Sequence, residues 1–360
     1  MVKHKTSALQ ENQGVSNSEI TNASAIAKIK SNRKNTTDVD SLLSGILNRD
    51  ITSLSQSITL IESTLPEHAQ KSNELLKKCL SHANKSIRIG ITGVPGVGKS
   101  TFIEVFGSFL TSIGKRVAVL AVDPSSSMNK GSILGDKTRM ETLVKNKNAF
   151  IRPSAASDTL GGVARKTRES IVLCEAAGFD VILIETVGVG QSETTVHSMV
   201  DFFLLLQLTG AGDELQGMKR GILEMADAVI INKADRANLN LAKSTASDFK
   251  KTLHLYSEKP SGWIPKVSTC SAIENKGIEN VWLIIQEYLQ VASKNDFFTI
   301  KRNEQNTFWL TETIKNSLTS TFFNNETVKK ELEQQLKLIE QNKTTPFAAA
   351  EYILNIKTKN

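Results

Sequence analysis

Cysteine, proline and tyrosine are scarce in this chain of 360 residues, and long apolar runs are missing. The three cysteines, Cys79, Cys174 and Cys270, are widely spaced and form no CxxC pair, so neither a disulfide framework nor a cysteine metal site is expected. The longest apolar runs, such as 202–206, are far shorter than the roughly 18 to 20 residues that cross a bilayer. These absences predict buried, reduced cysteines and no membrane-spanning segment.

Targeting signals are also missing from the start of the sequence. The first residues contain glutamates, few arginines and no apolar stretch of the kind that a secretory signal needs. We therefore expect a cytoplasmic protein.

The net charge of +7 is not concentrated in any one part of the chain. Residues 1–85, 86–292 and 293–360 carry surpluses of three, two and two positive charges. No segment has the stripe of lysine and arginine with interleaved aromatic residues that is typical of nucleic-acid binders. The charge therefore indicates solvated lysine-rich faces, and we expect no nucleic-acid partner.

The spacing of apolar residues divides the chain into four parts. Residues 1–40 are rich in Ser, Asn, Thr and Lys, which predicts a flexible tail. Residues 41–85 have apolar positions three and four apart, which predicts a helical N-terminal segment that stops near Pro66 and resumes after it. Residues 293–360 are helical again with an apolar stripe, and both packing on the chain's own core and a dimerisation arm are compatible with that stripe.

The remaining part, residues 86–292, alternates short apolar runs with helical segments. Runs that are apolar at consecutive positions suit strands buried on both faces. Their alternation with helices predicts an α/β fold with a doubly wound, mainly parallel sheet. The expected strands are 87–92, 117–122, 179–184, 202–208, 228–231 and 267–269.

The first expected strand leads into a phosphate-binding motif. Residues 93–101, GVPGVGKST, match GxxxxGK[ST] between a strand and a helix, which is the context of a P-loop. Gly96 and Gly98 permit the backbone conformations that aim N–H groups at phosphate oxygens. Lys99 supplies positive charge to the β- and γ-phosphates, and the Ser100 hydroxyl is a Mg²⁺ ligand. The predicted phosphate contacts are Gly93, Val94, Gly96, Val97, Gly98, Lys99, Ser100 and Thr101.

A second motif predicts which base is bound. Residues 232–235, NKAD, directly follow an expected strand, where a doubly wound sheet presents its ligand-binding loops. Asp235 can accept hydrogen bonds from the N1–H and 2-amino groups of guanine, whereas adenine offers no such pair. The predicted guanine contacts are Asn232, Lys233 and Asp235, together with Ser271 and Ala272 after the next strand. The expected ligands are therefore GTP and GDP.

Acidic residues near the ends of expected strands are candidate contacts of Mg²⁺. Glu185 begins the run ETVG, where GTPases usually carry DxxG, and Gly188 of that run would approach the γ-phosphate. Asp123 follows another expected strand, although a helix-cap or turn role beside the next proline is an alternative reading. Asp136 lies in a polar, glycine-flanked loop that suits a mobile switch. With Ser100, these three carboxylates form the predicted metal site.

One catalytic residue is absent from its usual place. Val189 follows Gly188, at the position where small Ras-like GTPases have the glutamine that orients the attacking water. Gln191 lies two residues further on and could substitute only if the loop rearranges. We therefore expect slow hydrolysis by the chain alone and stimulation by a partner.

Longer runs resemble a known family over nearly the whole chain from about residue 40. Together they resemble MeaB, the family of bacterial GTPases associated with methylmalonyl-CoA mutase. The runs are DPSSS (123–127), GSILGDKTRM (131–140), ETVGVGQSE (185–193), GAGDELQGMKRGILEMAD (210–227) and NKAD (232–235).

The resemblance implies a G-protein chaperone of a B12-dependent acyl-CoA mutase, with methylmalonyl-CoA mutase as the first expected client. Such a protein gates the loading of adenosylcobalamin and protects or reactivates the mutase. The resemblance also implies that the C-terminal arm forms a homodimer and that Lys219 moves toward the nucleotide when the mutase activates hydrolysis. From the pattern alone, Lys219 would be a solvated lysine. The candidate catalytic residues are thus Lys99, Gln191 and Lys219. Related G-proteins serve other mutases, so the client stays open.

Other functions share the P-loop. A small-molecule kinase of the arginine/ornithine-transport type would need an acceptor-activating base beside the γ-phosphate, and the sequence offers no candidate. A metal-insertion GTPase would carry a His-rich tract or a CxC or CxxC site, whereas the five histidines here are scattered. A signal-recognition-type GTPase would need a Met-rich apolar domain, which six methionines do not supply.

Overall fold

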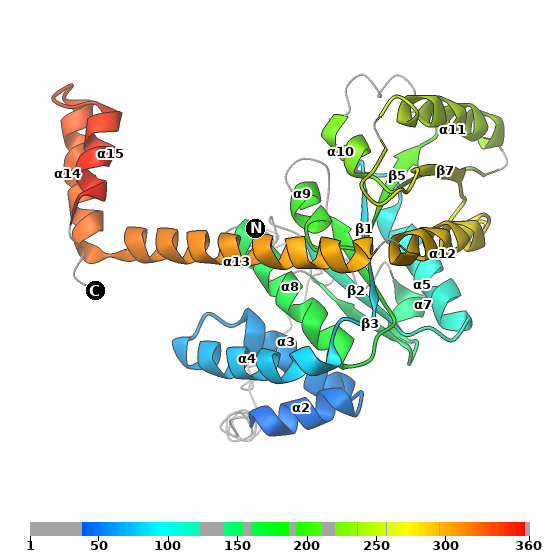
Figure 1. The fold of residues 1–360 in the computed structure, drawn as a ribbon, viewed down its shortest axis with the longest axis horizontal. Helices are drawn as coiled ribbons and strands as arrows, with labels where there is room; N and C mark the ends of the chain where they lie inside the picture. Colours follow the sequence, from blue (N-terminus) through cyan, green and yellow to red (C-terminus); the bar gives the residue numbers. More distant parts are fainter. Residues whose placement is uncertain are drawn as a thin grey trace, which may run out of the picture.

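The fold is that of a computed structural model, which describes residues 38–122, 140–153, 160–186, 192–210, 220–235, 237–256, 258–294 and 296–356. A sheet with helices on both faces forms the body, and a long helix leads away from it to a helical pair (Figure 1).

Seven strands form the sheet, in the order β3-β2-β4-β1-β5-β6-β7. Every pairing between these described strands is parallel. The order reverses direction at β1, so the sheet is doubly wound and the predicted α/β class is confirmed. The strands are β1 (Ile87–Gly93), β2 (Val117–Val122), β3 (Ala149–Arg152), β4 (Val181–Thr186), β5 (Phe202–Leu208), β6 (Ala228–Asn232) and β7 (Lys266–Thr269).

Two strands differ from the expectation by more than one residue. The strand expected at 179–184 begins two residues later, because Phe179 closes the preceding helix through its N–H to Cys174 O and the Asp180 carboxylate accepts from Arg116 N. The edge strand β3 was not expected at all. It has only four residues, three of them half-buried, so it lacks the continuous apolar run of the inner strands.

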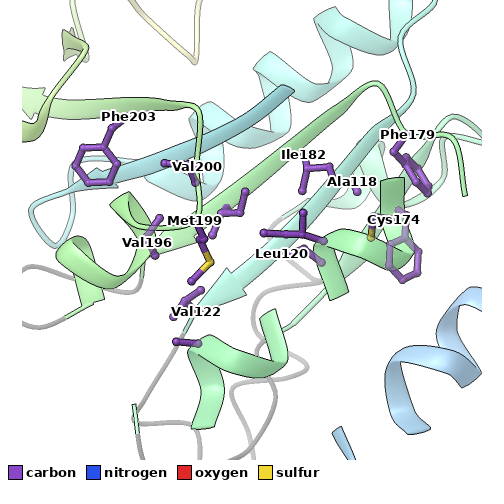
Figure 2. Packing of buried hydrophobic residues seen from close by; sticks show 14 of the residues in the cluster. Ala118, Leu120, Val122, Cys174, Phe179, Ile182, Val196, Met199, Val200 and Phe203 are labelled. Carbon is purple, nitrogen blue, oxygen red and sulfur yellow. The ribbon is translucent and has the colours of Figure 1, made fainter. Parts of the chain in front are cut away.

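Helices cover both faces of the sheet. On one face, buried side chains of α5 (Lys99–Ser112), α7 (Glu141–Val144) and α12 (Ile278–Lys294) pack against the strands. On the other face lie α8 (Leu160–Ala176), α9 (Ser192–His197), α10 (Arg220–Met225) and α11 (Leu239–Leu253). Figure 2 shows part of this second cluster, with Leu120 and Ile182 of the sheet near Cys174 of α8. The alternation of side chains along each strand thus fills two cores.

Three N-terminal helices extend the second cluster beyond the sheet: α2 (Val39–Leu47), α3 (Ile51–Glu62) and α4 (Pro66–Cys79), which a short 3-10 turn, η1 (Leu80–His82), follows. The Asp50 carboxylate caps α3 by accepting hydrogen bonds from Thr52 N and Ser53 N. Pro66 is the first residue of α4, where proline is tolerated because that position needs no N–H partner. An ion pair between Arg152 and Glu62 joins α3 to the edge strand β3.

The C-terminal part begins with α13 (Phe297–Asn324), a helix of 28 residues. It crosses the body and then extends from it to α14 (Glu326–Glu340) and α15 (Pro346–Leu354), which pack on each other (Figure 1). Apolar side chains stay exposed along the outer half of α13: Leu310, Ile314, Leu318 and Phe323. No helix in the described ranges has the length and apolar character that would let it cross a bilayer.

Candidate nucleotide-binding site

The predicted P-loop connects the end of β1 to the start of α5. Its last glycine, Gly98, caps α5 with a φ of 92°, in the left-handed region that favours glycine. A Cβ atom there would lie 3.1 Å from the side-chain nitrogen of Asn232, so the position is crowded as well as strained for other residues. The loop can therefore approach the neighbouring NKAD segment only because residue 98 has no side chain.

Lys99 folds back over this loop. Its Nζ donates hydrogen bonds to Gly93 O at 2.9 Å and to Val94 O at 3.5 Å. The side chain is buried, and burial lowers the pKa of Lys99, while the charges of Glu185 and Glu193 oppose that shift. An ammonium group held this way is already desolvated and oriented, and it can exchange the loop carbonyls for phosphate oxygens.

Ser100 lies beside the acidic residue that ends β4. Its Oγ donates to Glu185 Oε1 over 3.2 Å, and the Glu185 side chain is buried. The next residue, Thr186, donates from Oγ1 to Thr92 Oγ1 of β1 over 2.9 Å, which ties the two strand ends together. A hydroxyl and a carboxylate are the hard oxygen donors that Mg²⁺ prefers, so this pair fits the predicted metal.

Asn232 links the second motif to the P-loop. Its Nδ2 donates to Val97 O over 2.9 Å, and its Oδ1 accepts from Cys270 Sγ at 3.3 Å and from Ala272 N at 3.4 Å. The adjacent Lys233 has a positive φ of 59° and donates from Nζ to Gly96 O over 2.8 Å. Two consecutive residues of NKAD thus hold the phosphate loop and the 270–272 loop in one arrangement.

Asp235 is half-buried, and its Oδ1 accepts from Asn238 Nδ2 over 2.9 Å. The neighbouring loop closes through two hydrogen bonds between the backbones of Ser271 and Lys276, each 3.0 Å. Gly277 makes this turn possible, because it has a φ of 75° and a Cβ atom there would lie 2.5 Å from Thr269 O. The loop of Ser271 and Ala272 therefore has a fixed shape, and it is held to the NKAD segment by Ala234 N, which donates to Cys270 O over 3.0 Å.

The structure brings most of the predicted residues to one edge of the sheet. Gly93, Val94, Gly96, Val97, Gly98, Lys99 and Ser100 form the loop and its helix start, while Thr101 is exposed on the first turn of α5. Asn232, Lys233, Asp235, Ser271 and Ala272 stand beside them. Five other candidates lie outside the described residues, namely Asp123, Asp136, Gly188, Gln191 and Lys219.

Two buried residues of this region were not among the predicted contacts. Cys270 was expected to be a small buried hydrophobe; it is buried, but its thiol also donates to Asn232, and burial raises the pKa of Cys270 to about 12. Its place directly before Ser271 was the available signal. Glu193 is buried in the first turn of α9 and acts electrostatically on Lys99. It ends the quoted run ETVGVGQSE, and no spacing rule singled it out.

Comparisons with known proteins agree with this geometry. The family described as methylmalonyl Co-A mutase-associated GTPase MeaB matches residues 54–327. A probable GTPase of Mycobacterium tuberculosis is 46% identical over 318 residues, which are 88% of this chain and 95% of the relative. The GTPase ArgK of Escherichia coli is 42% identical over 81% of this chain and 88% of its own length.

A mitochondrial relative and a solved structure extend the comparison. The methylmalonic aciduria type A homolog of Mus musculus is 44% identical over 77% of this chain and 69% of its own length. The crystal structure of a LAO/AO transport system kinase has a TM-score of 0.71 and 34% identity, covering 89% of this chain and 97% of that one. The family match spans the sheet, both nucleotide motifs and the root of the arm, and the chain therefore belongs to the MeaB family of P-loop GTPases.

Proposed function

We propose that this protein binds and hydrolyses GTP and uses the cycle to act as a chaperone of a B12-dependent acyl-CoA mutase. The observation that carries the nucleotide part is the pair of hydrogen bonds from Asn232 to Val97 O and from Lys233 to Gly96 O. They hold a phosphate-binding loop next to a guanine-selective motif. A P-loop that served ATP would not need this second motif.

Different residues of the chain bind the phosphates, the metal ion, the base and the attacking water. Lys99 Nζ and the backbone N–H groups of the P-loop bind the β- and γ-phosphates. Ser100 Oγ and Glu185 would hold Mg²⁺, with Asp123 and Asp136 as further carboxylates, and the ion would supply charge neutralisation at the phosphates. Asp235 accepts from the guanine edge. Gln191 could orient water only if the segment around it rearranges, so we expect slow hydrolysis without a partner.

A comparison of the affinities for GDP and ADP tests the nucleotide assignment. Fluorescent GDP and fluorescent ADP are titrated separately into the full chain with Mg²⁺ present. We expect GDP to bind far more tightly, by roughly 10⁴ in a site built on hydrogen bonds to the base. Comparable affinities would refute the guanine assignment. Phosphate transfer to arginine or a similar acceptor would favour the kinase alternative, and nickel delivery would favour the metal-insertion alternative.

The mutase partnership rests on the family description and on the name of the mouse relative. We propose methylmalonyl-CoA mutase as the client, a homodimer formed through the arm, and a cytoplasmic location. The arm's exposed Leu310, Ile314 and Leu318 support an interface there. We keep the division into a tail (1–40), an N-terminal helical segment (41–85), a GTPase domain (86–292) and an arm (293–360).

Purified methylmalonyl-CoA mutase tests the partnership directly. We expect it to raise the rate of GTP hydrolysis and to accept adenosylcobalamin in a GTP-dependent manner when this protein is present. An unchanged rate together with nucleotide-independent loading would exclude methylmalonyl-CoA mutase as the client. Sedimentation of the protein alone tests the dimer, with Leu318→Glu as the variant expected to give monomers.

A further inference from the structure

Three side chains of α13 hold the short turn that connects α9 to β5. Trp309 Nε1 donates to Ser198 O over 3.1 Å, Gln305 Nε2 to Val200 O over 2.7 Å, and Lys301 Nζ to Asp201 O over 2.8 Å. The three donors are four residues apart, so they lie on one face of the helix. We call Lys301, Gln305 and Trp309 the α13 ladder.

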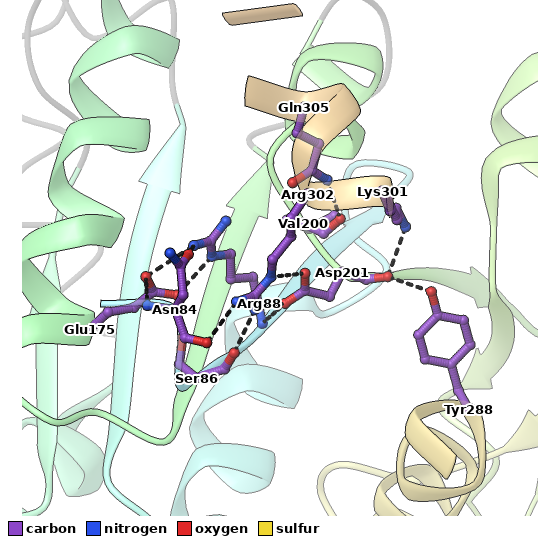
Figure 3. A network of polar contacts seen from close by, with 10 residues as sticks. All are labelled: Asn84, Ser86, Arg88, Glu175, Val200, Asp201, Tyr288, Lys301, Arg302 and Gln305. Atoms are coloured by element: carbon purple, nitrogen blue, oxygen red, sulfur yellow. Dashed lines mark hydrogen bonds and ion pairs between the residues drawn. The ribbon is translucent and has the colours of Figure 1, made fainter. Parts of the chain in front are cut away.

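A buried ion pair beside Lys301, at the N-terminal end of the ladder, also binds the turn (Figure 3). Arg302 donates from Nε to Asp201 Oδ1 over 2.9 Å and from Nη2 to Asp201 Oδ2 over 2.7 Å. The same carboxylate accepts from Arg88 N, and Asp201 N donates to Arg88 O, both over 2.8 Å. The turn is therefore fixed to β1 on one side and to the root of the arm on the other.

Helix α9 directly precedes this turn in the chain. It has only six residues, about 9 Å at 1.5 Å per residue, and it begins directly after segment 187–191. It also lies very close to β1 at Gly90. A Cβ atom there would be 3.0 Å from Val196 Cγ1 and 3.1 Å from Val200 Cγ2. With so little free space, α9 and the turn can shift only together.

We propose that Lys301, Gln305 and Trp309 are positioning residues for GTP hydrolysis. By holding the turn, they set the position of α9, whose buried Glu193 acts electrostatically on Lys99 of the phosphate loop. The inference rests on the proposed GTPase function. Coupling between two sites is reciprocal, so the nucleotide in turn changes how firmly the root of the arm is held.

The test removes hydrogen-bond donors from the ladder, with little change of side-chain volume at residue 305 and a modest loss at residue 309 that the control shares. In the double variant Gln305→Met/Trp309→Phe, two hydrogen bonds to the turn are lost. The matched control is Trp263→Phe, because Trp263 Nε1 donates to Asp227 O over 2.8 Å in the same way but lies outside the ladder. We expect kcat for GTP to fall about two- to tenfold per hydrogen bond lost, with KM for GTP and Kd for GDP within about twofold of wild type. The control should keep its kcat.

Hydrogen exchange separates positioning from a general loss of stability. In the wild type and the control, replacing GDP by a non-hydrolysable GTP analogue should change amide exchange both in α9 and in α13. In the double variant, the change should stay in α9 and disappear from α13. An arm that does not respond to the nucleotide in the wild type, or a double variant that keeps both its kcat and its response, would overturn the inference.

The same measurements distinguish this failure from failure of the proposed function. If the wild type binds GDP and hydrolyses GTP while α13 stays unresponsive, only the positioning role is wrong. If it binds no guanine nucleotide, the proposed function fails and the positioning role fails with it.

Discussion

Replacing Arg302 by methionine should strongly destabilise the protein. Arg302 Nε and Nη2 bind both oxygens of the Asp201 carboxylate, Nη1 donates to Asn84 O, and Nη2 also donates to Ser86 O. The two charged side chains are 9% and 1% exposed. In Arg302→Met, the Asp201 carboxylate stays buried without its cation, and two backbone carbonyls lose their donor.

The expected cost is about 3 to 5 kcal/mol, the usual result of removing one partner from a buried ion pair. That is a large share of the roughly 5 to 15 kcal/mol by which native proteins are stable. Urea unfolding of the full chain, followed by circular dichroism, measures the change. Lys266→Met is the control, because Lys266 and Glu287 form an ion pair at the surface, with side chains 43% and 51% exposed. Such pairs contribute about 0 to 1 kcal/mol.

A second substitution tests the physical reason. In Arg302→Met/Asp201→Asn, the unpaired buried charge is gone while an oxygen remains to accept from Arg88 N, so the double variant should be more stable than Arg302→Met alone. The reasoning is refuted if Arg302→Met costs no more than the surface control, or if Asp201→Asn makes it worse.

Three further outcomes follow from the site and its surroundings. Lys99→Ala should abolish nucleotide binding or turnover, and a fluorescent-GDP titration with normal affinity and rate would contradict the phosphate role. Lys219→Ala should keep slow basal hydrolysis but lose stimulation by the mutase, which a phosphate-release assay with and without mutase measures. His197 packs edge-on against Phe203, and its burial, followed by the charge of Lys301, lowers the pKa of His197 to about 4. Between pH 6.5 and 4 only the unfolded chain binds this proton, so stability should fall with decreasing pH by up to about 3 kcal/mol more in wild type than in His197→Gln. Equal pH dependence of the two unfolding free energies would show that folding does not lower the pKa of His197.

The inner strands and the P-loop could be predicted from the sequence because their signals are local. Val117–Val122 and Phe202–Leu208 are apolar at nearly every position, and the structure has strands at those bounds. The phosphate motif needs only eight consecutive residues. The hydrogen bond from Asn232 to Val97 O could not be predicted from local patterns, because the two residues are 135 positions apart in the sequence. Neither motif indicates how close the two loops lie in the folded chain.

The buried ion pair of Arg88 and Glu175 could not be predicted from the sequence for the same reason. Arg88 stands inside an otherwise apolar run and is only 1% exposed, because the Glu175 carboxylate, 87 residues later, accepts from its Nε over 2.8 Å. Gln305 and Trp309 look like ordinary positions of an amphipathic helix until α13 lies across the turn at 198–201. Interactions between distant parts of the chain depend on tertiary packing, which residue spacing does not describe.

Because α13 is long, a small rotation at its N-terminal end becomes a large displacement at its C-terminal end. A helix of 28 residues is about 42 Å long, so a rotation of about 5° near its first turns would sweep the far end through nearly 4 Å. The helical pair α14 and α15 would travel with it. A movement of less than about 1 Å beside the sheet would thus shift α14 and α15 far enough to make or break contact with another molecule.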